Sequence, residues 1–134
     1  MKFIPVVYKK HGLLSRWIVL QMLGQIFVEK KLISDIKEDK TFPFWHLIPE
    51  EKARSLFLLE RVLRNLTSLD YEINQHLKEK TSNKIVNILR IAAAEMFLDG
   101  IPTYAAIDSA VRLAKLDKKL LRFSGLVNAV CRKL

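Results

Sequence analysis

The chain has 134 residues, enough for one domain with its own hydrophobic core. Half of the residues are hydrophobic and 28% are charged, and the four glycines and four prolines exclude disordered and collagen-like classes. No apolar run approaches the roughly 18 residues of a membrane span, and the N-terminus lacks a signal-peptide pattern. The single cysteine, Cys131, excludes an internal disulfide and fits a reducing compartment, so we expect a cytoplasmic protein without a membrane partner.

The net charge of +9 is concentrated at the two ends of the chain. Residues 1–16 carry four basic residues and no acid, and residues 112–134 carry seven basic residues and one acid, whereas the segment between them sums to −1. A one-sided basic field of this kind is typical of a protein that binds a polyanion. It is equally compatible with a solvated surface that only keeps the protein soluble.

Hydrophobic spacing predicts helices along most of the chain. Residues 1–14 show no clear period and are expected to form an N-terminal extension. From Ser15 to about Lys30 apolar residues recur at three- and four-residue steps, and Arg16 lies off this stripe, where it can face solvent. A short helical piece follows from Leu32 to Glu38. Pro43 then breaks the pattern, because proline disfavours helical geometry in the residue before it.

The next helices begin and end at recognisable capping residues. Pro49 suits the first turn of a helix, and the acids that follow it complement the helix dipole. We expect an interruption at Thr67-Ser68, after which a second helix continues. Ser82 is typical of an N-cap, and Gly100 can adopt the left-handed conformation that closes a helix.

The helix predicted from Ser82 to Leu98 is nearly uncharged in its second half, which is typical of a helix at the centre of a bundle. Two more helices are predicted, from Thr103 to Lys115 and from Leu120 to Lys133. No alternation with a period of two runs for more than a few residues, so the sequence predicts no sheet. The predicted fold class is therefore all-α.

No residue pattern points to catalysis. Neither the three histidines nor Cys131 have metal-ligand spacing, and no glycine-rich phosphate loop or methyl-donor site is recognisable. Cys131 lies among apolar residues of a predicted helix, where a small buried hydrophobe is favoured over a thiolate nucleophile. We therefore expect no catalytic residue and no metal site in this chain.

Three polar residues in apolar surroundings are assigned to architecture. Glu95 follows three alanines, and a structural pair with Arg or Lys, or with a helix N-terminus, is favoured over a catalytic acid because an unpaired buried acid is costly. Asn128 is expected to hydrogen-bond a helix end inside the bundle, since buried amides need partners. Asp108 is a candidate partner or a complement to the helix dipole.

Basic residues are the candidates for a binding site. Arg112 and Lys115 are three positions apart and share a helix face, and the turn after them offers side chains together with free backbone N–H groups, which suits phosphate. Aromatic residues are sparse among them, which favours contacts to a nucleic-acid backbone over a platform that stacks bases. The candidate contact residues are Lys9, Lys10, Arg16, Arg112, Lys115, Lys118, Lys119 and Arg122.

Motifs between residues 15 and 134 resemble one family. Residues 16–23, RWIVLQML, are similar to an opening Arg-x-x-Ala-x-x-x-Leu helix, with Val19 where alanine is usual. Residues 101–115 resemble the signature Ile-Pro, Asn-or-Asp-x-Ala-Val-x-Leu-Ala-Lys, and residues 125–132 resemble a closing Phe-Val-Asn-Ala-Val-Leu-Arg. These motifs are typical of NusB-like RNA-binding domains. The resemblance implies a domain over residues 15–134, a bundle of about seven helices in two halves, and RNA as the ligand of the basic residues.

Two branches of this family differ in function. Free-standing NusB is an antitermination factor that binds a leader RNA together with a ribosomal protein. The other branch is the N-terminal domain of ribosomal RNA cytosine-C5 methyltransferases of the RsmB/Sun (Fmu) type. Residues 97–99, 104–106 and 128–132 look more like the methyltransferase branch. The chain also stops directly after its last predicted helix, as a domain cut from a longer protein does.

The methyltransferase branch is therefore the preferred hypothesis. It implies a module that helps to position ribosomal RNA, with S-adenosylmethionine bound only by a following catalytic domain and no cofactor in this chain. Partners would be ribosomal RNA and, in addition, its own methyltransferase domain or a ribosomal protein. A free-standing antitermination factor is the first alternative. A protein-interaction domain is the second, with Phe42 to Leu47 as an exposed contact patch.

Overall fold

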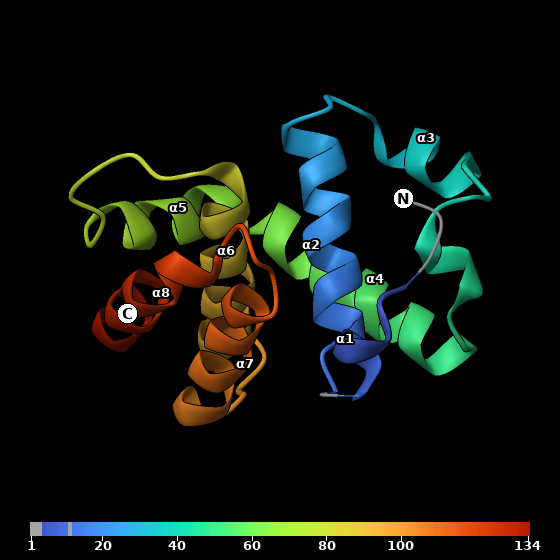
Figure 1. Cartoon of the computed structure of the whole chain (residues 1–134). Helices are drawn as coiled ribbons and strands as arrows, with labels where there is room; N and C mark the ends of the chain where they lie inside the picture. Colours follow the sequence, from blue (N-terminus) through green and yellow to red (C-terminus); the bar gives the residue numbers. More distant parts are fainter. Residues whose placement is uncertain (1–3, 11) are drawn as a thin grey trace.

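A computed structural model describes residues 4–10 and 12–134 of the chain. All regular elements in these residues are helical (Figure 1), which confirms the all-α fold class. They are, in chain order, α1 (Val6–Lys10), α2 (Leu14–Phe27), α3 (Ile33–Glu38), the 3₁₀ helix η1 (Pro43–His46), α4 (Pro49–Arg64), α5 (Leu66–Asn74), α6 (Asn83–Phe97), α7 (Thr103–Lys115), the 3₁₀ helix η2 (Leu121–Phe123) and α8 (Ser124–Lys133). None of these helices is long and apolar enough to cross a membrane.

Helix α6 lies at the centre of the bundle, as its apolar sequence predicts. It contacts α2 and α4 from the N-terminal half and α5, α7 and α8 from the C-terminal half. Figure 1 shows the two halves side by side, with α2 and α6 where they meet. Ile85, Ile88 and Leu89 of α6 are completely buried. The sequence forms this arrangement because a helix that is apolar on most sides must be surrounded by other helices.

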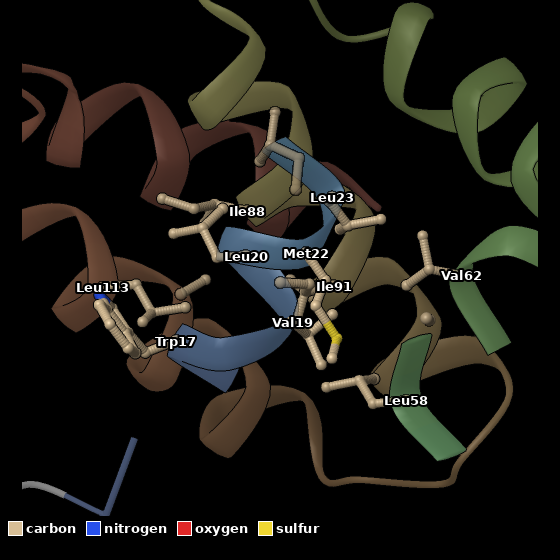
Figure 2. Packing of buried hydrophobic residues seen from close by; sticks show 14 of the residues in the cluster. Trp17, Val19, Leu20, Met22, Leu23, Leu58, Val62, Ile88, Ile91 and Leu113 are labelled. Atoms are coloured by element: carbon tan, nitrogen blue, oxygen red, sulfur yellow. The ribbon is translucent and has the colours of Figure 1, made fainter. Parts of the chain in front are cut away.

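The core fills the space between α2 and α6 and extends to α4 and α7. Figure 2 shows Val19 and Met22 of α2 beside Ile91 of α6, with Leu58 and Val62 of α4 near them. Small side chains let the backbones of α6 and α7 approach closely. The buried alanines of these two helices are Ala92, Ala93, Ala94, Ala106, Ala110 and Ala114.

Helix α1 packs against α2. Tyr8 is buried and its ring stacks on that of Trp17, with the ring centroids 5.3 Å apart and the planes at 27°. Burial raises the pKa of the Tyr8 hydroxyl, and the negative charge of Asp117 raises it further.

Several helix boundaries agree with the local chemistry of the sequence. Pro49 is the first residue of α4, and α7 has the bounds predicted for it. As the N-cap of α6, Ser82 accepts a hydrogen bond at its Oγ from the backbone N–H of Ile85, at 3.4 Å. Gly100 has φ +67°, the left-handed conformation that favours glycine after a helix.

The break between α4 and α5 differs from the prediction. It lies at Asn65, with φ −116° and ψ 20°, whereas Thr67 and Ser68 lie inside α5. Asn65 Nδ2 donates a hydrogen bond to the carbonyl oxygen of Arg61 at 2.9 Å. An amide side chain that bonds the preceding turn competes with the helix backbone, and this explains why the helix ends here.

The segment from Phe42 to Leu47 is not an exposed contact patch. Phe42, Phe44 and Leu47 are only 4–6% exposed and belong to the hydrophobic core. Pro43 opens η1, and this short helix turns the apolar side chains of the segment toward the bundle. The prediction is wrong because a segment too short for an α-helix still supplies core side chains when it folds over the bundle.

Cys131 is buried, with 1% of its surface exposed, as its apolar surroundings predict. Burial raises the pKa of its thiol from 9.0 to about 12, because the thiolate would lose its hydration. A thiol held in its protonated form at neutral pH is unreactive, which agrees with a packing role and not with a nucleophile.

We expect the raised pKa of Cys131 to make the protein less stable at high pH. The unfolded chain ionises this thiol near pH 9, whereas the folded chain keeps the proton until about pH 12, so the stabilisation is complete below pH 9 and is lost as the pH rises toward 12. Urea unfolding between pH 8 and pH 11 measures this loss. The Cys131→Ala variant should show a shallower decline, because it keeps Tyr8 and lacks only the thiol, and equal declines in both proteins would contradict the assignment.

Candidate nucleic-acid interface

Four of the predicted contact residues gather at the connection between α7 and α8. Lys115 ends α7, Lys118 and Lys119 lie in the turn, and Arg122 lies in η2, and all four side chains are exposed. Within the described part of the chain, none of the four forms an ion pair. The fold therefore presents four cationic groups without acidic partners on one short connection.

Asp117 fixes the backbone of this turn. Its Oδ1 accepts a hydrogen bond from the backbone N–H of Lys119 at 2.9 Å. Its carbonyl oxygen accepts hydrogen bonds from the N–H groups of Leu120 and Leu121, each at 2.9 Å. Its Oδ2 lies 3.7 Å from Nζ of Lys84 on α6. The turn thus has a defined shape, and the 3₁₀ helix η2 that it starts explains why α8 begins at Ser124 and not near Leu120.

Arg112 differs from these four residues because its charge is partly neutralised. Its Nε lies 3.1 Å from Oδ2 of Asp108, one turn earlier on α7. Both side chains are exposed to about half of their surface or more, so this pair contributes little to stability and can open when a ligand arrives. Asp108 therefore pairs with Arg112 on the surface and does not serve as the partner of Asn128.

Arg16 reaches from α2 to Glu95 on α6. Its Nε donates a hydrogen bond to Oε1 at 2.9 Å and its Nη2 donates one to Oε2 at 2.8 Å. The Glu95 side chain is 7% exposed and that of Arg16 is 23% exposed. The structural pair predicted for Glu95 is confirmed, and the expectation that Arg16 faces solvent is wrong, since the buried carboxylate holds its guanidinium. Contact between Arg16 and RNA stays a prediction.

Lys9 lies apart from this connection. It is exposed on α1 and lines a hollow of about 450 Å³ with His46 and Arg54, among others. The side chain of Lys10 lies outside the described part of the chain. The structure thus gathers half of the predicted contact residues at one place and leaves Lys9 and Arg16 at others.

A groove of about 850 Å³ runs between α7 and α8, which lie next to each other in Figure 1. Lys115 lines it, together with three residues that were not predicted as contacts, Tyr104, Asn128 and Arg132. Tyr104 lies in the first turn of α7 and is 79% exposed. The groove therefore joins an exposed aromatic ring to the basic connection.

Asn128 lines this groove and does not bond a helix end inside the bundle. Its Oδ1 accepts a hydrogen bond from Nε of Arg132 at 3.2 Å. The prediction is wrong because α8 turns Val127, Val130 and Cys131 toward the core, which leaves Asn128 on an adjacent face. The spacing of those three residues, together with the four-residue step from Asn128 to Arg132, is the signal that could have indicated this face.

The loop between α5 and α6 supplies further basic residues that were not predicted. Lys78 and Lys80 line a hollow of about 370 Å³ together with Lys133 of α8. These lysines come from a middle segment with almost no net charge, so the charge pattern of the sequence gives no indication of them. In the described residues, no group of three or more His, Cys, Asp or Glu side chains is arranged to hold a metal ion.

The fold and this surface define a class of protein: a helical bundle whose exposed cationic side chains gather at one connection between helices. The chain belongs to the NusB family, whose sequence profile matches residues 14–134.

Two relatives named transcription antitermination protein NusB are similar to the chain. The relative from Bacillus licheniformis is 34% identical over 113 residues, which are 78% of this chain and 82% of the relative. The relative from a Cyanothece species is 36% identical over 98 residues, which are 67% of this chain. The match spans only 46% of the length of the Cyanothece protein. No solved structure matches the chain.

Proposed function

We propose that this chain is a cytoplasmic RNA-binding protein that acts in transcription antitermination. The observation that carries the proposal is the connection between α7 and α8, where Lys115, Lys118, Lys119 and Arg122 are exposed and form no ion pair with any described residue. Cationic side chains on a backbone of defined shape suit the phosphates of RNA. The name transcription antitermination protein, carried by both relatives, supports the second part of the proposal.

Replacing Lys118, Lys119 and Arg122 together with glutamine should weaken RNA binding and reduce its dependence on salt. Each phosphate contact releases bound counterions, so the loss of three contacts should lower the slope of log affinity against log salt by about two units for a single strand. Fluorescence anisotropy titrations of a labelled single-stranded RNA at several salt concentrations measure this slope.

A matched control removes the same charge from another surface. Lys30, Lys31 and Lys37 are exposed around the connection between α2 and α3. Their replacement with glutamine changes the net charge equally and should leave the slope near that of the unmodified protein. An unchanged slope in the variant of the α7–α8 connection, or equal changes in both variants, would contradict the proposed RNA contact.

The antitermination part of the proposal needs its own measurement. In a bacterial transcription extract depleted of its own NusB-family protein, added chain should increase the fraction of transcripts that extend past a terminator. The triple glutamine variant at Lys118, Lys119 and Arg122 should restore less read-through. RNA binding without any read-through would separate the two parts and leave only the RNA-binding protein.

The RNA-binding module of a ribosomal RNA cytosine-C5 methyltransferase is the second candidate. It rests on the likeness of residues 128–132 to that branch, whereas both relatives carry the antitermination name. In this role the chain would bind ribosomal RNA and contact a methyltransferase domain, which alone would bind S-adenosylmethionine. Preference for ribosomal RNA fragments over a leader RNA, together with no effect on read-through, would favour it.

A further inference from the structure

The groove between α7 and α8 has more than one kind of contact surface. Its α7 wall carries the apolar side chains of Ile107 and Val111, and Tyr104 stands at the end where α7 begins. Tyr104 is 79% exposed, so its ring is available to a ligand in the groove. A ring that packs against no core and borders a groove of about 850 Å³ is a surface on which a flat aromatic ligand can stack.

The charged groups of the groove are mainly positive. Lys115 lies at the end of α7, and Arg132 lies near the end of α8. Among the described residues, Asp108 is the one acid that lines the groove, and it is paired with Arg112 at 3.1 Å. The groove therefore attracts an anionic ligand, because the charge of Asp108 that could repel it is already partly neutralised by Arg112.

Polar groups of the groove can distinguish one base edge from another. Oδ1 of Asn128 already accepts a hydrogen bond from Nε of Arg132 at 3.2 Å, which leaves the Asn128 amide NH₂ as a donor. The backbone N–H of Ser124, where α8 begins, is already bonded to the carbonyl oxygen of Leu121, so the phosphate contacts of the groove come from its basic side chains.

The length of the groove fits a strand rather than a single small molecule. Tyr104 and Lys115 are eleven positions apart on α7, which corresponds to a rise of about 16 Å along the helix. Stacked bases and regularly spaced phosphates along such a length are the chemistry of unpaired RNA. The groove also ends at the connection that carries Lys118 and Lys119, so a strand held there continues into it.

We propose that the groove between α7 and α8 binds a short unpaired stretch of RNA, with one base stacked on Tyr104. Lys115 and Arg132 hold its phosphates, and the amide of Asn128 contacts a base edge. The site rests on the RNA binding proposed above and adds to it a preference for single strands. It also changes the sequence-based expectation of pure backbone binding, because the fold brings an aromatic ring to the basic surface.

Replacing Tyr104 with alanine tests this site. Loss of one stacked base should weaken the affinity for a single-stranded oligonucleotide about 5- to 100-fold, while the salt slope stays unchanged because no charge is removed. Tyr104→Trp should retain binding, and the affinity for double-stranded RNA should change little. Tyr71 on α5 is the matched control, since it is 67% exposed and lies outside the groove, and Tyr71→Ala should bind like the unmodified protein.

The outcomes separate this site from the proposed function. If the unmodified protein binds no RNA, both proposals fail. The triple variant at Lys118, Lys119 and Arg122 can reduce the slope of log affinity against log salt while Tyr104→Ala binds RNA normally. In that case only the groove site is overturned. Equal weakening of RNA binding by Tyr104→Ala and Tyr71→Ala would also overturn the groove site. Competition by a polyglutamate peptide that requires Tyr104 would overturn it in favour of an acidic protein ligand.

Discussion

Replacing Glu95 with alanine should lower the free energy of unfolding by about 2–3 kcal/mol. The change leaves Arg16 of α2 without the carboxylate that it meets on α6. Removal of one partner from a fully buried pair costs about 3–5 kcal/mol, and we expect less here because Arg16 keeps 23% of its side-chain surface in solvent. Urea unfolding followed by far-ultraviolet circular dichroism measures the loss.

A surface pair on α4 serves as the control for Glu95. Arg64 Nη2 and Glu60 Oε2 are 3.9 Å apart and both side chains are mostly exposed, so Glu60→Ala should cost less than about 0.5 kcal/mol. Replacing Arg16 and Glu95 together with methionine should recover part of the loss, because no unpaired charge then remains. A loss from Glu95→Ala no greater than that from Glu60→Ala would show that the pair does not join α2 to α6 energetically.

Replacing Ile91 with alanine should destabilise the protein by about 3–4 kcal/mol, since it removes a completely enclosed side chain and leaves a cavity. Ile91 is 1% exposed and lies beside Val19 and Met22 of α2 in Figure 2. In a protein of this size such a loss corresponds to a fall in Tm of about 10 °C or more. Thermal unfolding followed by circular dichroism provides the measurement.

Two further variants show whether this loss comes from the core. Ile91→Val removes one methyl group and should cost about 1 kcal/mol. Leu121→Ala removes as many carbon atoms as Ile91→Ala, but Leu121 lies in η2 and is 51% exposed. This variant should therefore cost much less than Ile91→Ala. Similar losses for Ile91→Ala and Leu121→Ala would mean that the space between α2 and α6 is not the main source of stability.

Helix boundaries set by local chemistry could be predicted from the sequence. The start of α7 follows from Pro102 before it, and Gly100 has the left-handed conformation expected after α6. The break after α4 was placed wrongly, because Thr67 and Ser68 are weak helix formers that a buried face can still keep helical, whereas Asn65 bonds the preceding turn. Helix propensity alone does not decide whether the break falls at Asn65 or at Thr67-Ser68.

Long-range partners could not be predicted in the same way. The burial cost of an acid predicted a structural pair for Glu95, but Arg16 is 79 positions away and only the contact between α2 and α6 identifies it. The segment from Phe42 to Leu47 was expected to be exposed as the contact patch of a protein-interaction domain. Its burial depends on how the chain folds back over the bundle, which local sequence does not specify.

The sequence predicted the basic residues of the candidate site but not the groove beside them. The basic residues at Lys115, Lys118, Lys119 and Arg122 were recognisable because they cluster in sequence. The groove that continues from them requires α7 and α8 to lie side by side, and it brings Tyr104 close to residues some 25 positions later in the chain. Sparse aromatic residues in the local sequence are therefore a poor guide to what a folded surface offers a base.

The turn held by Asp117 has a consequence for the thermodynamics of association. A flexible basic loop must be immobilised when it meets its ligand, and the conformational entropy lost at that step reduces the net affinity. Here two backbone N–H groups, the N–H of Lys119 and the ammonium of Lys84 already fix the turn around one aspartate. The lysines can then meet a polyanion as rigid docking partners, so that the encounter rate and not a rearrangement of the loop limits complex formation.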